Sequence, residues 1–125
     1  MRVSAAETLI DSLLCTGFPY NLRIEGDYLV GLFADFLATA RAVRRLGSAA
    51  IDLAYVACGR FDGFWEVRLN PWDISAGALL IEEAGGQVST LDGGPFDSRR
   101  GEIIASNGRV HDQMVDVIRS RKRTA

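Results

Sequence analysis

Hydrophobic and polar positions follow two rhythms along this chain, one typical of strands and one typical of helices. Short apolar or alternating runs predict strands at residues 12–18, 43–46, 61–67, 87–91 and 102–106. Apolar residues spaced three or four positions apart predict helices at residues 28–40, 48–59, 74–84 and 109–119. Strands that alternate with helices of this length predict an α/β layer fold, in which helices flank a mostly parallel sheet.

Polar residues and glycines mark the ends of the predicted helices. Asp27 and Ser48 each precede an apolar helical stripe, so both are candidate N-caps. Gly59 follows the second helix, and Gly85 and Gly86 follow the third, which are positions where glycine commonly ends a helix. Capping chemistry and periodicity therefore predict the same boundaries.

The size and composition of the chain predict one ordered domain over residues 1–125. Hydrophobic residues make up 48% of it, which excludes disorder, and no repeat or low-complexity linker divides it. The formal net charge is -2. Because basic residues crowd positions 119–123, the preceding body is more acidic still, and a general nucleic-acid partner is not expected. The basic tail, residues 119–125, is predicted to be a frayed and solvated helix end, with phosphate contact as the alternative.

Three residues with reactive side chains are predicted to be chemically inert. Cys15 and Cys58 lie in apolar surroundings without a CxxC or Cys/His spacing, so we expect both to be reduced and buried. His111 has no cysteine or second histidine nearby, and we expect it to be exposed and non-catalytic. No apolar run is long enough to span a membrane, and the first residues do not resemble a signal peptide. A cytoplasmic protein without a membrane partner is the expectation.

Ligands of α/β proteins bind at loops and helix starts beside the carboxyl ends of strands, and one such segment is "GSAA" at residues 47–50. The small residues Gly47, Ser48 and Ala49 would let backbone amides approach a ligand closely, and the start of a helix favours an anion. Small residues at a helix start also serve close packing. The pattern alone leaves both interpretations open.

The second segment, "FWEVRLNPWD", places Glu66 near the end of a strand and Asp73 at the start of the next helix. A carboxylate at either position is a candidate ligand for a metal ion or a hydroxyl group. The alternatives are that Asp73 caps the helix by accepting from a following amide, and that Glu66 is a surface carboxylate paired with Arg68 or another cation. Magnesium requires about six oxygens from carboxylates, waters and substrate phosphate together, so one aspartate is not a complete site.

Several longer stretches resemble the C-terminal half of the inositol monophosphatase family. They are "CTGFPY", "RRLGSAAIDLAYVACGRFDGFWE", "LNPWDISAGALLIEEAGG", "GGPF" and "IIASN", spread over about residues 9–118. The WDxxAG and EAGG block is among the more specific signatures. The resemblance implies a domain like the C-terminal part of an αβαβα sandwich, in a phosphomonoesterase that uses Mg2+ and is inhibited by Li+.

The same resemblance implies roles for the candidate site residues. Asp73 looks like a metal-binding aspartate that also approaches the substrate hydroxyls. Glu66 looks like the glutamate that hydrogen-bonds the alcohol portion, and Gly47, Ser48 and Ala49 look like the small-residue turn beside the sugar ring. The implied substrate is inositol monophosphate or a similar small phosphate ester, with histidinol phosphate or a 3'-phosphorylated nucleotide as alternatives.

Other metal ligands of the family come from an N-terminal glutamate and a DPxDGT-like block, which this sequence lacks. We therefore expect the isolated chain to have little or no phosphatase activity. The expected partner is the missing N-terminal half or a homologous subunit, and an uncovered apolar face is expected to produce homo-oligomers. The alternative is a non-catalytic module, derived from such an enzyme, that binds a partner or dimerises.

Overall fold

In the computed structural model, which describes residues 1–123, strands alternate with helices as the sequence pattern predicts. The strands are β1 (Leu13–Thr16), β2 (Ala42–Arg44), β3 (Gly63–Glu66), β4 (Gln87–Ser89) and β5 (Ile103–Ser106). The helices are α1 (Gly26–Thr39), α2 (Ala49–Ala57), α3 (Pro71–Glu83) and α4 (His111–Arg119), with short 3-10 helices η1 (Leu9–Asp11) and η2 (Ser98–Arg100). Within the described residues, no helix has the length and apolar character needed to cross a membrane.

The strands form one mixed sheet in the order β2-β1-β3-β5-β4. β1 pairs in parallel with both β2 and β3, so that Leu14 lies opposite Val43 on one side and Gly63 on the other. β5 runs antiparallel to β3 and β4, so the mostly parallel sheet of the prediction contains one reversed strand. The chain leaves β1 toward β2 and then returns past β1 to form β3. This reversal creates a topological switch point at the carboxyl ends of the three strands.

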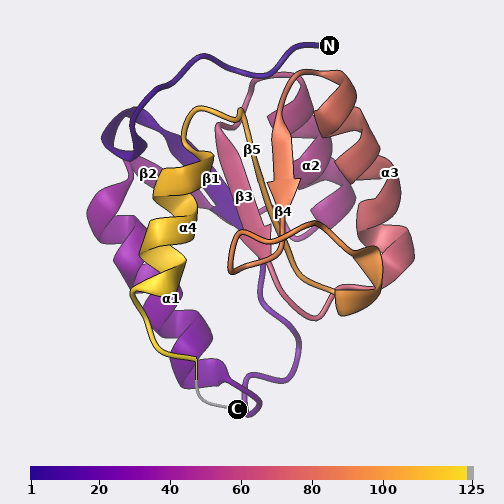
Figure 1. Cartoon of the computed structure of the whole chain (residues 1–125). Coiled ribbons are helices and arrows are strands. Elements are labelled where there is room, and N and C mark those ends of the chain that lie inside the picture. The colour runs from indigo at the N-terminus through magenta and orange to yellow at the C-terminus, as the bar shows by residue number, and fades with distance from the viewer. Residues whose placement is uncertain (124–125) are drawn as a thin grey trace.

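Helices cover both faces of the sheet, as Figure 1 shows. Residues of α1 and α4 share a core with Leu14 and Trp65, whereas α2 and α3 share a second core with Cys15 and Phe64. Successive residues of a strand point to opposite faces, which is why neighbours in β1 and in β3 belong to different cores. The predicted α/β layer fold is confirmed.

Two helices bury most of the stripe that apolar spacing predicts, including Phe36 in α1 and Leu53 in α2, but their inner faces are rotated slightly from it. In α1, the spacing of Phe33, Phe36 and Leu37 predicts that all three face inward, yet Leu37 is 50% exposed and Leu32 is fully buried in its place. In α2, Leu53 and Val56 are fully buried, and Asp52 lies in the interior with them at 1% exposure. Periodicity predicts that a helix has an inner face, but its orientation depends on neighbours that are distant in the sequence.

His111 is buried, which corrects the expectation that it is exposed. Its Nε2 and Nδ1 atoms lie 2.8 Å from the hydroxyl oxygens of Ser89 and Ser106, respectively. The Ser89 hydroxyl donates to the Thr90 carbonyl, so it accepts from Nε2, and Nδ1 accepts from Ser106. Neutral imidazole satisfies this arrangement, and burial lowers the pKa of His111.

The two cysteines differ in their surroundings. Cys15 is buried as predicted, and burial raises the pKa of its thiol far above the usual range, so the thiol stays protonated and unreactive. Cys58 is exposed, contrary to the prediction, because it is the C-cap residue of α2 and lies beyond the buried stripe of that helix.

The described part of the basic tail leaves the helix after Arg119 and is exposed, and two of its arginines also pair with α1. The Arg121 guanidinium pairs with Asp35 at 2.6 Å, and the Arg123 guanidinium pairs with Glu25 at 2.5 Å. These ion pairs hold the described part of the tail along the helix. Residues 124–125 of the predicted tail lie outside the described residues.

Candidate functional site

A cleft of about 500 Å³ opens at the carboxyl ends of β1, β2 and β3. Its walls are the loop after β1, the turn before α2, the end of β3 and the first turn of α3. All the site residues that the sequence predicted line this cleft, namely Gly47, Ser48, Ala49, Glu66 and Asp73. The fold therefore gathers them at the switch point of the sheet, where α/β proteins bind ligands.

A helix cap holds the turn at residues 47–49. Gly47 has a φ of 86°, a conformation that glycine adopts without strain. Ser48 is the N-cap of α2, as predicted, and its hydroxyl accepts a hydrogen bond from the Ile51 amide at 3.3 Å. Because this cap fixes the turn, its small side chains leave room for a ligand beside the start of α2.

Asp73 is half-buried and lies in the third position of α3, after the N-cap residue Asn70 and Pro71. Its Oδ2 atom accepts a hydrogen bond from the Asn70 amide at 3.0 Å. The capping alternative, in which Asp73 is itself the N-cap and accepts from a following amide, is therefore wrong. Within residues 1–123, Oδ1 of Asp73 has no hydrogen-bond partner, which leaves one carboxylate oxygen available to a ligand.

Glu66 ends β3, and its carboxylate lies against Gly17, where a Cβ atom would collide with it. Burial raises the pKa of Glu66 to about 7, with further contributions from the negative charges of Asp52 and Asp73 and an opposing one from Arg45. The alternative of a surface ion pair does not hold, because Arg68 pairs with Glu25 and, within the described residues, Glu66 forms no salt bridge with another cation. Glu66 can therefore either accept or donate a hydrogen bond near neutral pH.

Asp52 is a residue that the sequence analysis missed. It lies in the first turn of α2, and neither of its carboxylate oxygens has a hydrogen-bond partner within the described chain. Burial raises the pKa of Asp52 to about 6. Its negative charge also raises the pKa of Glu66, so this interior carboxyl group acts on the electrostatics of the cleft without lining it. The sequence signal that could have indicated a role for Asp52 is its position directly beside the apolar residues of the helix.

The carboxylates of the cleft meet the requirements of magnesium only in part. Within residues 1–123, no group of three histidine, cysteine, aspartate or glutamate side chains is placed to hold a metal ion. Asp73 fits the role of one ligand, since it lines the cleft and has an oxygen without a hydrogen bond. The other ligands of a six-coordinate ion would have to come from water, substrate or another polypeptide segment.

Residues 1–123, nearly the whole chain, match the inositol monophosphatase family. The chain belongs to this family. The match confirms the resemblance that the sequence motifs indicated.

Relatives within the inositol monophosphatase family are considerably longer. The chain is 46% identical over 114 residues to an inositol-1-monophosphatase of Synechocystis sp., which covers 91% of this chain and 40% of that protein. It is 44% identical over 115 residues to Nus factor SuhB of Salmonella typhimurium, which covers 92% of this chain and 43% of that protein. The structure of inositol monophosphatase from Anabaena (Nostoc) sp. matches with a TM-score of 0.93 at 43% identity, over 98% of this chain and 50% of that chain. The chain thus spans about half the length of the relatives it matches.

Proposed function

We propose that this chain supplies the alcohol-binding side, and one metal ligand, of a magnesium-dependent phosphomonoesterase that acts on inositol monophosphate or a similar small phosphate ester. The observation that carries the proposal is the meeting of Asp73, Glu66 and the 47–49 turn in one cleft. Membership of the inositol monophosphatase family supports it.

The roles divide according to the chemistry of each group. Asp73 uses its free carboxylate oxygen to bind Mg2+, and its hydrogen bond with Asn70 fixes the orientation of the side chain. Glu66 binds a substrate hydroxyl, and the 47–49 turn bounds the ring of the alcohol. When bound, magnesium supplies Lewis-acid activation of the phosphate ester and of the attacking water.

The remaining metal ligands are proposed to come from polypeptide outside residues 1–125. The chain spans about half of its relatives, and within the described residues no three metal-binding side chains meet. Alone, the chain is proposed to hydrolyse little or nothing, with the N-terminal half or a homologous subunit completing the site.

The test is complementation. Purified chain is incubated with inositol monophosphate and Mg2+, alone and after mixing with the N-terminal half of the Synechocystis relative. We expect Li+-sensitive hydrolysis only in the mixture. Asp73→Asn should abolish it, whereas Glu82→Gln, which also replaces a carboxylate of α3 by an amide but lies on an exposed position, should not. Hydrolysis by the chain alone at the rate of a complete family enzyme would contradict the proposed division.

A second candidate function is a non-catalytic module that binds a partner or dimerises. Three observations favour it. No three metal-binding side chains meet within residues 1–123, and a relative at 44% identity carries the name Nus factor. Large apolar side chains are exposed at Tyr20, Trp72 and Leu79, which is suited to association with another polypeptide. Inactivity in every mixture, together with concentration-dependent dimerisation in analytical ultracentrifugation, would favour this candidate.

A further inference from the structure

Within residues 1–123, the non-glycine residues with positive φ are Glu25, at 61°, and Arg68, at 59°. Residues other than glycine rarely adopt this left-handed backbone conformation, and strained residues of this kind cluster at functional sites. The two residues are joined directly, because Nη2 of Arg68 lies 2.9 Å from Oε2 of Glu25. Position 68 therefore carries a guanidinium group, although glycine would adopt the same backbone conformation without strain.

Glu25 is also clamped by the basic tail. Nε and Nη2 of Arg123 lie 2.5 Å and 3.1 Å from the two carboxylate oxygens of Glu25. These hydrogen bonds from Arg123, with a smaller contribution from Arg68, lower the pKa of Glu25. Glu25 therefore stays ionised, and one negative charge is shared by two guanidinium groups. The triad of Arg68, Glu25 and Arg123 carries a net positive charge, which leaves Arg68 with donors to spare.

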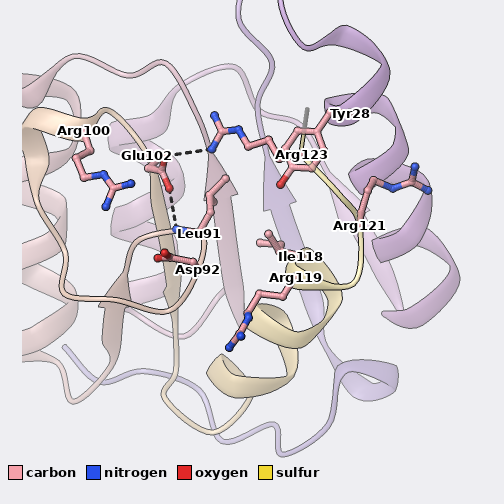
Figure 2. A pocket seen from close by; sticks show the side chains of 9 residues that line it. All are labelled: Tyr28, Leu91, Asp92, Arg100, Glu102, Ile118, Arg119, Arg121 and Arg123. Atoms are coloured by element: carbon pink, nitrogen blue, oxygen red, sulfur yellow. Dashed lines mark hydrogen bonds and ion pairs between the residues drawn. The ribbon is translucent and has the colours of Figure 1, made fainter. Parts of the chain in front are cut away.

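Arg123 is itself fixed by two further contacts. Its guanidinium lies 3.3 Å from Oε1 of Glu102 and 5.5 Å from the centre of the Tyr28 ring. Figure 2 shows Arg123 reaching Glu102 beside a pocket of about 240 Å³, separate from the candidate cleft. Glu102 in turn accepts from the Leu91 amide at 2.9 Å. Arg68 is thus oriented by a connected set of ion pairs that ends in the interior of the fold.

Arg68 and Arg45 both line the candidate cleft and are exposed, so we call them the rim arginines. The Arg45 guanidinium lies 5.0 Å from the centre of the Phe18 ring, another residue of the cleft lining. Glu66 and Asp73, the acidic residues of the lining, are less exposed than these arginines. The cleft therefore combines a recessed acidic region with a basic rim.

We propose that Arg68, held by Glu25 and Arg123 and accompanied by Arg45, binds an anionic group on the alcohol portion of the substrate. This inference rests on the proposed function, in which this chain contacts the alcohol and the reacting phosphate lies with the metal. The substrate class is then a phosphate ester whose alcohol carries a second negative charge, either a carboxylate or another phosphate. Guanidinium groups bind both through paired charge-assisted hydrogen bonds.

The test compares three sugar phosphates that share one ring. Glucose 1-phosphate carries no second anion, glucuronic acid 1-phosphate carries a carboxylate in place of the terminal hydroxymethyl group, and glucose 1,6-bisphosphate carries a second phosphate there. Affinity for the purified chain is measured by isothermal titration calorimetry with Mg2+ present. We expect at least one of the doubly anionic ligands to bind about tenfold more tightly than glucose 1-phosphate, and the tighter of the two identifies the source of the charge.

Three variants locate the origin of this preference. Arg68→Gly removes the guanidinium and the backbone strain together, so it should abolish the preference without lowering the urea midpoint. Arg123→Gln, which frees Glu25 to neutralise Arg68, should reduce the preference by about half of its free energy. Arg121→Gln is the matched control, because Arg121 makes a similar ion pair from the same tail to α1 but does not contact the triad. It should leave the preference unchanged.

The outcomes separate this inference from the proposed function. Binding of all three ligands with equal affinity overturns the role of the rim arginines and leaves the alcohol site intact. A preference that survives in Arg68→Gly also overturns it. Failure of every ligand to bind overturns both the alcohol site and the inference. If Arg68→Gly does not fold, the comparison of Arg123→Gln with Arg121→Gln decides.

Discussion

Asp73 accepts a hydrogen bond from the amide of Asn70 and at the same time lines the cleft. A single carboxylate thus closes the first turn of α3 and remains open to a ligand through its second oxygen. The structural and functional interpretations of Asp73 are not exclusive, and different substitutions separate them.

Asp73→Ala and Asp73→Asn are predicted to have different effects on stability and the same effect on function. Alanine removes the acceptor of the Asn70 amide and should lower the free energy of unfolding by about 1 kcal/mol. Asparagine keeps an acceptor and should change stability much less. Both should reduce hydrolysis by the complemented enzyme about 100-fold or more, the cost of losing a well-placed charge. Urea unfolding and steady-state kinetics measure the two quantities, and full activity in Asp73→Asn would contradict metal binding.

Asp52→Asn is predicted to stabilise the chain at neutral and higher pH. The folded pKa of Asp52, about 6, lies above its ordinary value of 3.8, so the folded state holds a proton more tightly than the unfolded state. Stability is therefore lost as the pH rises from about 4 to about 6. Asparagine carries no charge and should raise the free energy of unfolding by about 2 kcal/mol at pH 8, with little gain at pH 4. Equal urea midpoints of Asp52→Asn and the unchanged chain at pH 8 would contradict the inference that Asp52 is a buried carboxylate without a partner.

His111→Gln is predicted to alter the acid sensitivity of the chain in the opposite direction. The folded pKa of His111 is lowered by burial, so below pH 6.5 the unfolded state binds a proton that the folded state excludes. The contribution of His111 to stability is present above pH 6.5 and falls as the pH drops toward the folded pKa. Glutamine should lower the free energy of unfolding by about 1–3 kcal/mol at pH 7.5, because it leaves part of the hydrogen bonding of Ser89 and Ser106 unpaired. The stability difference between the variant and the unchanged chain should shrink as the pH falls to 5. A difference in urea midpoints that stays constant with pH would contradict the lowered pKa of His111.

Gly17→Ala is predicted to weaken ligand binding with little loss of stability. An added Cβ atom collides with the end of the Glu66 side chain, which is flexible and can move away. Displacing this carboxylate should lower the affinity for inositol monophosphate about tenfold or more. Gly26→Ala is the control, since its Cβ atom would meet only Leu22 at 3.4 Å. Calorimetry should show unchanged affinity for the control, and the same result for Gly17→Ala would exclude Glu66 from the ligand site.

Local chemistry was sufficient to predict much of this fold and its cleft. Alternation along a strand predicts that the consecutive residues Phe64 and Trp65 point to opposite faces, and they occupy different cores. Ser48 was recognised as a cap from its own position, and the structure confirms it. The gathering of the predicted site residues followed from a general property of parallel strands, whose carboxyl ends meet at one edge.

Features that depend on distant contacts could not be predicted. His111 is buried because Ser89, 22 positions away, supplies one of its partners. Asp52 is buried because α2 presents to the sheet a face rotated from its apparent stripe. Asp27 lies in the first turn of α1, while Glu25 occupies the N-cap position in a strained conformation. None of these contacts is encoded by spacing within one element.

The reversal of β5 brings its first residue, Ile103, opposite Glu66, so the long segment between β4 and β5 arrives beside the candidate cleft. Gly101 there accepts from the Leu69 amide at 2.8 Å, and a Cβ atom on it would lie 2.7 Å from the Leu69 carbonyl. Residues 92–99, none of which lines the cleft, therefore offer a region for a combinatorial library that leaves the cleft lining unchanged. Such a library must retain Gly101, since any larger residue would push the Leu69 backbone out of register.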